Sequence, residues 1–212
     1  MTIAAARSSS ESPPIPPGAT SANWRWLALG GSTGGPAALR QLLAELSTAL
    51  SLRVVIVQHI AHGLERDLAS WLTAALGREV LVAVDAERQP PGTVRLAPAG
   101  AHLRVSGEDH LVLDRASPPR AGHRPSVDEL FFSLASAAPL QTAAVLLSGM
   151  GSDGAEGLLA LRRAGAFCLA QDEASSAIFG MPRAALDLGA AELALPPRAL
   201  GRELARRLRE RD

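Results

Sequence analysis

The chain of 212 residues contains no lysine, so all 21 of its basic residues are arginines. This absence excludes a lysine nucleophile, a Schiff base and the lysine of a phosphate-binding loop. The single cysteine, Cys168, lies in the apolar run AFCLA. One thiol builds neither a disulfide framework nor a multi-cysteine zinc site, and it fits a reducing compartment. A position inside a buried strand also argues against a catalytic thiol.

Charge of one sign and long apolar runs are missing as well. The formal net charge is zero, so the chain lacks the basic surface that binds nucleic acid or anionic membranes. It has no signal-peptide pattern and no apolar run long enough to span a bilayer. We therefore expect a cytoplasmic protein without membrane insertion. The motif His59-x-x-His62 alone supplies too few ligands for a metal, so we expect neither a metal nor another cofactor.

Strand-like and helix-like patterns alternate along most of the chain. Residues 1–22 are rich in serine and proline and predict a disordered tail, whereas residues 23–212 predict one domain. The alternation predicts an α/β fold with a doubly wound, mainly parallel sheet flanked by helices. Short β segments between 90 and 114, with a turn at 106–109, predict a small antiparallel hairpin extension. The predicted strands cover 26–29, 53–58, 80–84, 143–148 and 167–170, and the predicted helices cover 36–46, 64–76, 126–138, 155–164, 180–188 and 197–212.

The segment GGSTGG at 30–35 joins the first predicted strand to the first predicted helix. It fits the G-x-S-x-G nucleophile elbow, in which small neighbours let a strained turn hold Ser32 above the sheet. The helix that begins near Pro36 would direct its free N–H groups toward this serine. A phosphate cradle fits less well, because Pro36 replaces the Walker lysine and Ser32 interrupts G-x-G-x-x-G. A plain glycine-rich turn with an incidental serine is the remaining alternative.

Three reactive side chains follow directly after apolar strands. They are Ser32, His59 and Asp153. Ligands of doubly wound sheets bind at the carboxyl ends of the strands, so one edge of the sheet could bring all three together. A serine nucleophile needs an imidazole base, and the imidazole needs a carboxylate that fixes its tautomer. The sequence therefore predicts a Ser-His-Asp triad.

Each triad member has a competing interpretation. His59 could be a hydrogen-bonded residue at a strand end, and His102 is its main competitor as the base. His62, His110 and His123 are further rivals, of which the last two are weak because they lie at a hairpin and in a loop. Asp153 could simply cap the helix that begins at Gly154. Similarly, Ser126 is predicted to cap the helix through Ala138, in a capping box with Glu129.

With these motifs, the chain resembles a known family, the catalytic domain of the chemotaxis protein-glutamate methylesterases, or CheB. The resemblance covers nearly everything from Trp24 to about Leu195. It rests on six blocks in order: GGSTGG at 30–35, QH at 58–59, LAPAGAHL at 96–103, HRPSVDELF at 123–131, LLSGMGSDGAEGL at 146–158 and AQDEASSAIFGMPRAAL at 170–186.

The resemblance implies hydrolysis of γ-glutamyl methyl esters on the cytoplasmic helices of methylated chemoreceptors, with release of methanol and often deamidation of receptor glutamines. It places the family's triad on Ser32, His59 and Asp153. A noncatalytic module that docks on receptors or on a signalling partner is the alternative, although an intact triad favours the enzyme.

The resemblance also implies roles outside the triad. The backbone N–H groups of Thr33 and Met150 are expected to bind the oxyanion, and Gly149 and Gly151 are expected to supply positive φ angles at that turn. Arg124 and Arg183 are expected to orient the acidic receptor helix, or to form internal ion pairs.

Many family members carry an N-terminal receiver domain, phosphorylated on aspartate, that covers the active site. Here only residues 1–22 precede the first strand. We therefore expect a constitutively open domain that is controlled by expression, by receptor availability or by a separate regulatory protein.

Overall fold

The computed structural model describes residues 23–46 and 51–210; the predicted tail lies outside the described residues. The strands are β1 (Trp26–Gly31), β2 (Arg53–Gln58), β3 (Val80–Val82), β4 (Glu87–Arg88), β5 (Val94–Leu96), β6 (His102–Ser106), β7 (His110–Asp114), β8 (Thr142–Leu146), β9 (Phe167–Gln171) and β10 (Leu193–Leu195). The helices are α1 (Gly35–Ala44), α2 (Glu65–Leu76), α3 (Val127–Ala137), the short 3₁₀ turn η1 (Pro139–Gln141), α4 (Ala155–Arg163), α5 (Met181–Asp187) and α6 (Pro197–Arg209). Among the described helices, none is both long and apolar enough to cross a bilayer.

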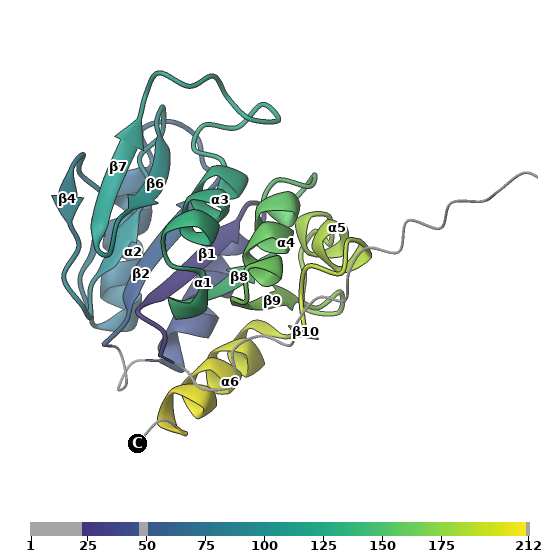
Figure 1. Ribbon diagram of the computed structural model, residues 1–212. Helices are drawn as coiled ribbons and strands as arrows, with labels where there is room; N and C mark the ends of the chain where they lie inside the picture. Colours follow the sequence, from purple (N-terminus) through teal and green to yellow (C-terminus); the bar gives the residue numbers. More distant parts are fainter. Residues whose placement is uncertain (1–22, 47–50, 211–212) are drawn as a thin grey trace, which may run out of the picture.

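The main sheet is parallel and has helices on both faces (Figure 1). Within the described residues its strands lie in the order β10-β9-β8-β1-β2-β5-β3, and a second, antiparallel sheet has the order β4-β7-β6. The predicted fold class, an α/β domain with a small antiparallel extension, is therefore confirmed. The face of the sheet on which a strand side chain lies determines which helices that side chain contacts.

Side chains of β1 alternate between two hydrophobic cores. Trp26 and Ala28 point toward the core shared with α3, α4, α5 and the antiparallel sheet. Leu27 and Leu29 point toward the opposite core, which contains leucines of α1, α2 and α6. Because both faces are covered, all six residues of β1 are buried. Such a strand is uniformly apolar, as strands of parallel sheets with two covered faces are.

The strand order reverses beside β1. The chain first adds β2 on one side of β1 and later returns to place β8 on the other side. Gly31 pairs with Gln58 in the β1–β2 register, and the N–H of His59 donates to the carbonyl of Gly31 at 2.9 Å. Residues that follow β1, β2 and β8 therefore meet at one edge of the sheet. This is the switch point at which doubly wound sheets bind ligands.

The structure corrects parts of the predicted secondary structure. The segment Val94–Leu96 was assigned to the antiparallel extension, but as β5 it pairs in parallel with β2 and β3 in the main sheet. All three of its residues are buried, as a position between two strands requires. The short strands β4 and β10 were not predicted. Each has only two or three residues, too few for a periodic pattern.

Candidate active site

Ser32 lies at the apex of the turn between β1 and α1 and is partly exposed. Its N–H donates to the carbonyl of Ser148 at 2.9 Å, and its carbonyl accepts from the N–H of Gly35 at 2.9 Å. Gly34, the residue before the helix, has φ 84°, which favours glycine. At Gly35 a Cβ atom would lie 2.0 Å from Oε1 of Gln58. The turn is therefore tight in the way that a nucleophile elbow requires.

Gln58 is a residue of the site that the sequence analysis did not single out. Its Nε2 donates to the carbonyl of Ser32 at 2.7 Å and to the carbonyl of His59 at 2.9 Å. The side chain thus joins the ends of β1 and β2 and fixes the backbone of two predicted triad residues. Its signal in the sequence is a polar residue at the end of an otherwise apolar buried strand, followed at once by a histidine.

His59 and Asp153 are joined by a hydrogen bond. Nε2 of His59 lies 2.8 Å from Oδ2 of Asp153, and both side chains are largely buried. An ionised carboxylate only accepts hydrogen bonds, so Nε2 carries the proton and Nδ1 of the neutral ring is an acceptor. Nδ1 is buried and has no hydrogen-bond partner among the described residues. The ring therefore offers one free basic nitrogen at the edge of the sheet where Ser32 lies.

The carboxylate of Asp153 lies at the start of α3. It accepts from the hydroxyl of Ser126 at 2.7 Å and from the N–H groups of Val127 at 2.8 Å and Asp128 at 3.1 Å. Burial raises its pKa, but the hydrogen bonds from His59, Ser126 and the two backbone groups outweigh burial, so the pKa lies below its usual value. Asp153 is therefore an anion that stabilises imidazolium. It does not cap α4, whose N-cap is Gly154 with no side-chain hydrogen bond.

Ser126 and His102 form a second serine–histidine contact near Asp153, but neither has a free reactive group. The hydroxyl of Ser126 is completely buried, donates to Asp153 and caps α3 by accepting from the N–H of Glu129. The predicted N-cap is thus confirmed. The N–H of Ser126 donates to Nδ1 of His102 at 3.2 Å, and Nε2 of His102 contacts the carbonyl of Pro118 at 3.1 Å. With both ring nitrogens engaged, His102 is excluded as the base.

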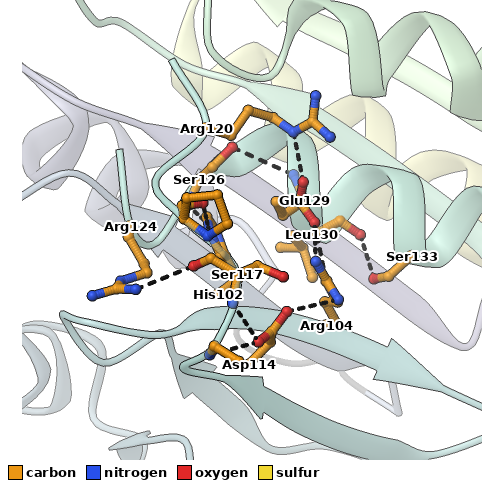
Figure 2. A network of polar contacts seen from close by, with 12 residues as sticks. His102, Arg104, Asp114, Ser117, Arg120, Arg124, Ser126, Glu129, Leu130 and Ser133 are labelled. Atoms are coloured by element: carbon orange, nitrogen blue, oxygen red, sulfur yellow. Dashed lines mark hydrogen bonds and ion pairs between the residues drawn. The ribbon is translucent and has the colours of Figure 1, made fainter. Parts of the chain in front are cut away.

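Glu129 does not complete the predicted capping box. Its carboxylate instead meets the guanidinium groups of Arg104 and Arg120, as Figure 2 shows. These charge-assisted contacts are stronger than a bond to one backbone N–H, so they win the competition for the side chain. The result is a link between β6, the loop after β7 and the first turn of α3.

His123 lies directly on His59, although the sequence placed it in a loop and ranked it a weak candidate. The two ring centroids are 3.8 Å apart and the ring planes differ by 4°. Nothing local in the sequence predicts this stacking, because it depends on how the loop before α3 folds over the sheet. The other two histidines do not enter the site: His62 is exposed, and His110 pairs with Asp109.

The proposed oxyanion donors lie on two neighbouring turns. Thr33 is exposed in the turn before α1, and Met150, after β8, exposes 67% of its surface. The turn that carries Met150 is held by hydrogen bonds from the N–H of Gly149 to Ile178 and from the N–H of Met181 to Gly149. Of its two glycines, only Gly151 has a positive φ, 83°. At position 149 there is no room for a side chain, because a Cβ atom there would lie 2.7 Å from Cβ of Ser32.

The two predicted substrate arginines differ in their surroundings. Arg124 donates from Nη1 to the carbonyl of Arg115 at 3.2 Å and to that of Ser117 at 3.1 Å, the latter contact visible in Figure 2. It thereby closes its own loop, and it forms no ion pair with any residue that the structure describes. Arg183 is exposed and lies 3.7 Å from Asp187 on α5. A role of either residue in substrate binding stays a prediction.

A cavity of about 480 Å³ is lined in part by Asp153, and its walls also include Asp128, Glu156 and Asp187. Asp128 is buried, and its carboxylate accepts from the N–H of Gly157 at 2.7 Å. Burial raises the pKa of Asp128 to about 6, and the nearby charges of Asp153 and Glu156 add to this effect. Across the described residues, no group of histidine, cysteine and carboxylate side chains is arranged to hold a metal ion.

Comparisons with known proteins show which family the chain resembles. The family model described as CheB methylesterase matches residues 27–204. The protein-glutamate methylesterase/protein-glutamine glutaminase of Bordetella parapertussis is 46% identical over 186 residues, which cover 86% of this chain and 53% of that relative. The similarly named protein of the group 3 operon of Rhizobium meliloti is 46% identical over 165 residues, covering 78% of this chain and 46% of the relative.

A solved structure is also similar. The crystal structure of the Thermotoga maritima CheB methylesterase catalytic domain matches with a TM-score of 0.81 and 30% sequence identity. The match covers 86% of this chain and 98% of that domain. The chain thus spans about half the length of the curated relatives, and nearly the whole of a catalytic domain.

Proposed function

The chain belongs to the CheB methylesterase family, and from this premise we propose that it hydrolyses glutamyl methyl esters by a Ser32–His59–Asp153 mechanism. The observation that carries the proposal is the pairing of His59 with a buried, ionised Asp153 at 2.8 Å, which leaves Nδ1 of His59 buried and unpartnered. This nitrogen is suited to take the proton of a hydroxyl at the apex of the neighbouring turn.

In the first half of the reaction, Ser32 Oγ attacks the ester carbonyl while its proton passes to Nδ1 of His59. The oxyanion of the tetrahedral intermediate binds the N–H groups of Thr33 and Met150. Collapse of the intermediate breaks the bond to the methoxy group, which leaves as methanol with the proton from His59. Asp153 stabilises the imidazolium throughout and does not itself take up the proton.

In the second half, a water molecule replaces the alcohol. His59 removes a proton from the water as its oxygen attacks the acyl carbon. The bond between that carbon and Ser32 Oγ then breaks, and Oγ takes the proton from His59. The products are the glutamate side chain as its carboxylic acid, which ionises, and free Ser32. With a glutamine side chain the same steps would release ammonia in place of methanol. That route corresponds to the glutaminase activity in the names of the relatives.

The proposed substrates are methylated glutamates, together with glutamines, on the cytoplasmic helices of chemoreceptors. The proposed location of the protein is accordingly the cytoplasm. Arg124 and Arg183 are proposed to face the acidic receptor helix. One domain, residues 23–212, is proposed to carry the activity. Control by a separate regulatory protein stays a prediction.

A noncatalytic docking module on the same fold is the second candidate function. It requires no basic nitrogen beside the serine, whereas the described site keeps the nucleophile turn, the imidazole and the carboxylate together. The two functions differ in one measurement. Purified protein incubated with methylated receptor fragments should release methanol in many turnovers if it is the esterase. Binding of the same fragments without any methanol release would instead support the docking module.

A further inference from the structure

The function proposed above leaves one contact of the site unused. The imidazole of His123 lies parallel to that of His59, with the centroids 3.8 Å apart. His59 is thus held at its Nε2 edge by Asp153 and on one face by a second aromatic ring. His123 itself forms no hydrogen bond through its side chain with any residue that the structure describes.

The turn that presents His123 is built for this placement. The N–H of His123 donates to the carbonyl of Arg120 at 2.9 Å, and the N–H of Arg120 donates back at 3.1 Å. Between them, Ala121 has φ 48° and Gly122 has φ 84°. Two consecutive left-handed residues give the tight turn of type I′. A left-handed alanine costs roughly 1–2 kcal/mol, so the surroundings must stabilise this conformation.

Those surroundings are the polar network of Figure 2. Arg120 is bound to Glu129 on α3, and Arg124 is bound to two carbonyls of the preceding loop. On the other side of the loop, His102 contacts the carbonyl of Pro118 and accepts from the N–H of Ser126. The loop that carries His123 is therefore anchored before and after the turn.

We propose that His123 is a positioning residue, whose ring holds the imidazole of His59 in the plane where Nε2 meets Asp153 and Nδ1 is left without a hydrogen-bond partner among the described residues. The inference rests on the proposed function, because it concerns the base of that reaction. His123 acts through His59 and does not touch the reacting atoms. An imidazole tied at one edge alone can still rotate about that hydrogen bond, and a flat ring against its face removes this freedom.

The electrostatics of the stack agree with such a role. Burial lowers the pKa of His123, the charge of His59 lowers it further, and Asp153 acts in the opposite direction. These two residues, at the end of β2 and before α4, are the titratable groups that act on His123. The guanidinium groups of Arg120 and Arg124 are directed at Glu129 and at loop carbonyls. Burial and His59 thus favour the neutral form of His123, and a neutral ring does not repel the imidazolium of His59.

Three variants test the proposal. His123→Ala removes the stacking ring, and His123→Phe keeps a flat ring without any titratable or hydrogen-bonding atom. His110→Ala is the matched control, because His110 lies on the antiparallel sheet and pairs with Asp109. For each folded variant we would measure kcat and KM for methanol release across pH, and the rate at which a fluorophosphonate probe modifies Ser32.

A positioning role predicts that His123→Ala lowers kcat and the labelling rate ten- to a hundredfold with little change in KM, the cost of a misplaced catalytic group. His123→Phe should restore both rates to within a few fold of wild type, and His110→Ala should match wild type.

Three outcomes would overturn the proposal. The first is an unchanged kcat for His123→Ala. The second is a rise in KM at constant kcat, which would make His123 a substrate contact. The third is a His123→Phe variant as slow as His123→Ala, which would mean that the nitrogen atoms are needed. The labelling assay separates this inference from the proposed function. A wild-type protein that is labelled at Ser32 but releases no methanol would refute the proposed substrate. The labelling rates of the variants, compared with the wild-type rate, would still test the role of His123.

Discussion

Oδ2 of Asp153 accepts a hydrogen bond from Nε2 of His59 at 2.8 Å, while the same carboxylate accepts the first N–H groups of α3. The start of α3 therefore holds the carboxylate in place and favours its ionised form. A residue that the sequence placed in the triad thus also accepts hydrogen bonds from the first turn of a helix in another part of the chain.

Asp153→Asn should leave the protein folded and reduce kcat by about 10³–10⁴-fold. An amide has one accepting oxygen, so it cannot accept hydrogen bonds at both oxygen positions of the carboxylate. An amide N–H directed at Nε2 of His59 would place the ring proton on Nδ1. The base would then carry a proton where it must accept one. Methanol release measured beside circular dichroism tests this, with the exposed Asp67→Asn on α2 as control. A turnover within tenfold of wild type would show that the carboxylate does not fix the tautomer.

Gln58→Glu should lower both stability and turnover. The glutamate carboxylate has the same shape but cannot donate to the carbonyls of Ser32 and His59. Carbonyl groups left without a hydrogen-bond donor cost about 1–3 kcal/mol or more of stability. Gln58→Met, which also lacks the donor but buries no charge, should be less harmful. Urea unfolding and methanol release measure the two effects. Wild-type values for Gln58→Glu would mean that the two bonds do not hold the turn.

Gly149→Ala should reduce turnover more than Gly151→Ala. The new methyl group at 149 would crowd Cβ of Ser32 and Sδ of Met181, whereas the methyl group at 151 enters open space and costs only the strain of a positive φ, roughly 1–2 kcal/mol. Kinetic measurements on both variants check the order.

Met150→Leu is the control for these glycine variants, because only the backbone N–H of Met150 is assigned to the oxyanion. It should keep most of the activity. A severe loss in Met150→Leu, or the reverse order of the two glycine variants, would contradict the assigned turn geometry.

Asp128→Asn should stabilise the protein more at pH 8 than at pH 5. The pKa of Asp128 is raised to about 6 in the folded protein, so the buried carboxyl group is favourable only when it is protonated. Its contribution to the free energy of unfolding is fully present below the pKa of Asp128 in the unfolded chain, and it is lost as the pH rises through 6. Asparagine does not ionise and can still accept from Gly157. The gain at pH 8 is on the order of 2–3 kcal/mol from the size of the shift. Urea titrations at both pH values measure it, with Asp187→Asn at the exposed rim of the cavity as control, and an equal effect at both would be contrary evidence.

Much of the fold could be predicted because its signals are local. The strands before Ser32 and His59 are continuous apolar runs, and the helices that follow them have periodic apolar residues. The carboxyl ends of strands in a parallel sheet must share an edge. The strand β10 has only Leu193–Leu195, partly exposed, and carries no comparable pattern. Likewise β5 is too short to reveal from sequence whether its partner runs parallel or antiparallel.

The site divides in the same way. Ser32 and His59 directly follow β1 and β2, and Asp153 lies in the turn between β8 and α4, so topology alone indicated them. The roles of His123 and Gln58 depend on contacts made across the sheet edge. The stacking of His123 needs a loop that is ordered by residues of three other elements, and no spacing in the sequence encodes that arrangement. Gly149 was expected to need a special φ, but the structure shows that a neighbouring side chain is what limits it.

The central claim is that Ser32 is the nucleophile and that the buried Ser126 is structural. The most direct test is the rate of methanol release from a methylated receptor fragment by folded Ser32→Ala and Ser126→Ala. We predict that Ser32→Ala loses roughly 10³–10⁶-fold in kcat, whereas Ser126→Ala, which loses one of several hydrogen bonds to Asp153, loses far less. Near-normal methanol release by Ser32→Ala, or a loss confined to Ser126→Ala, would contradict the account.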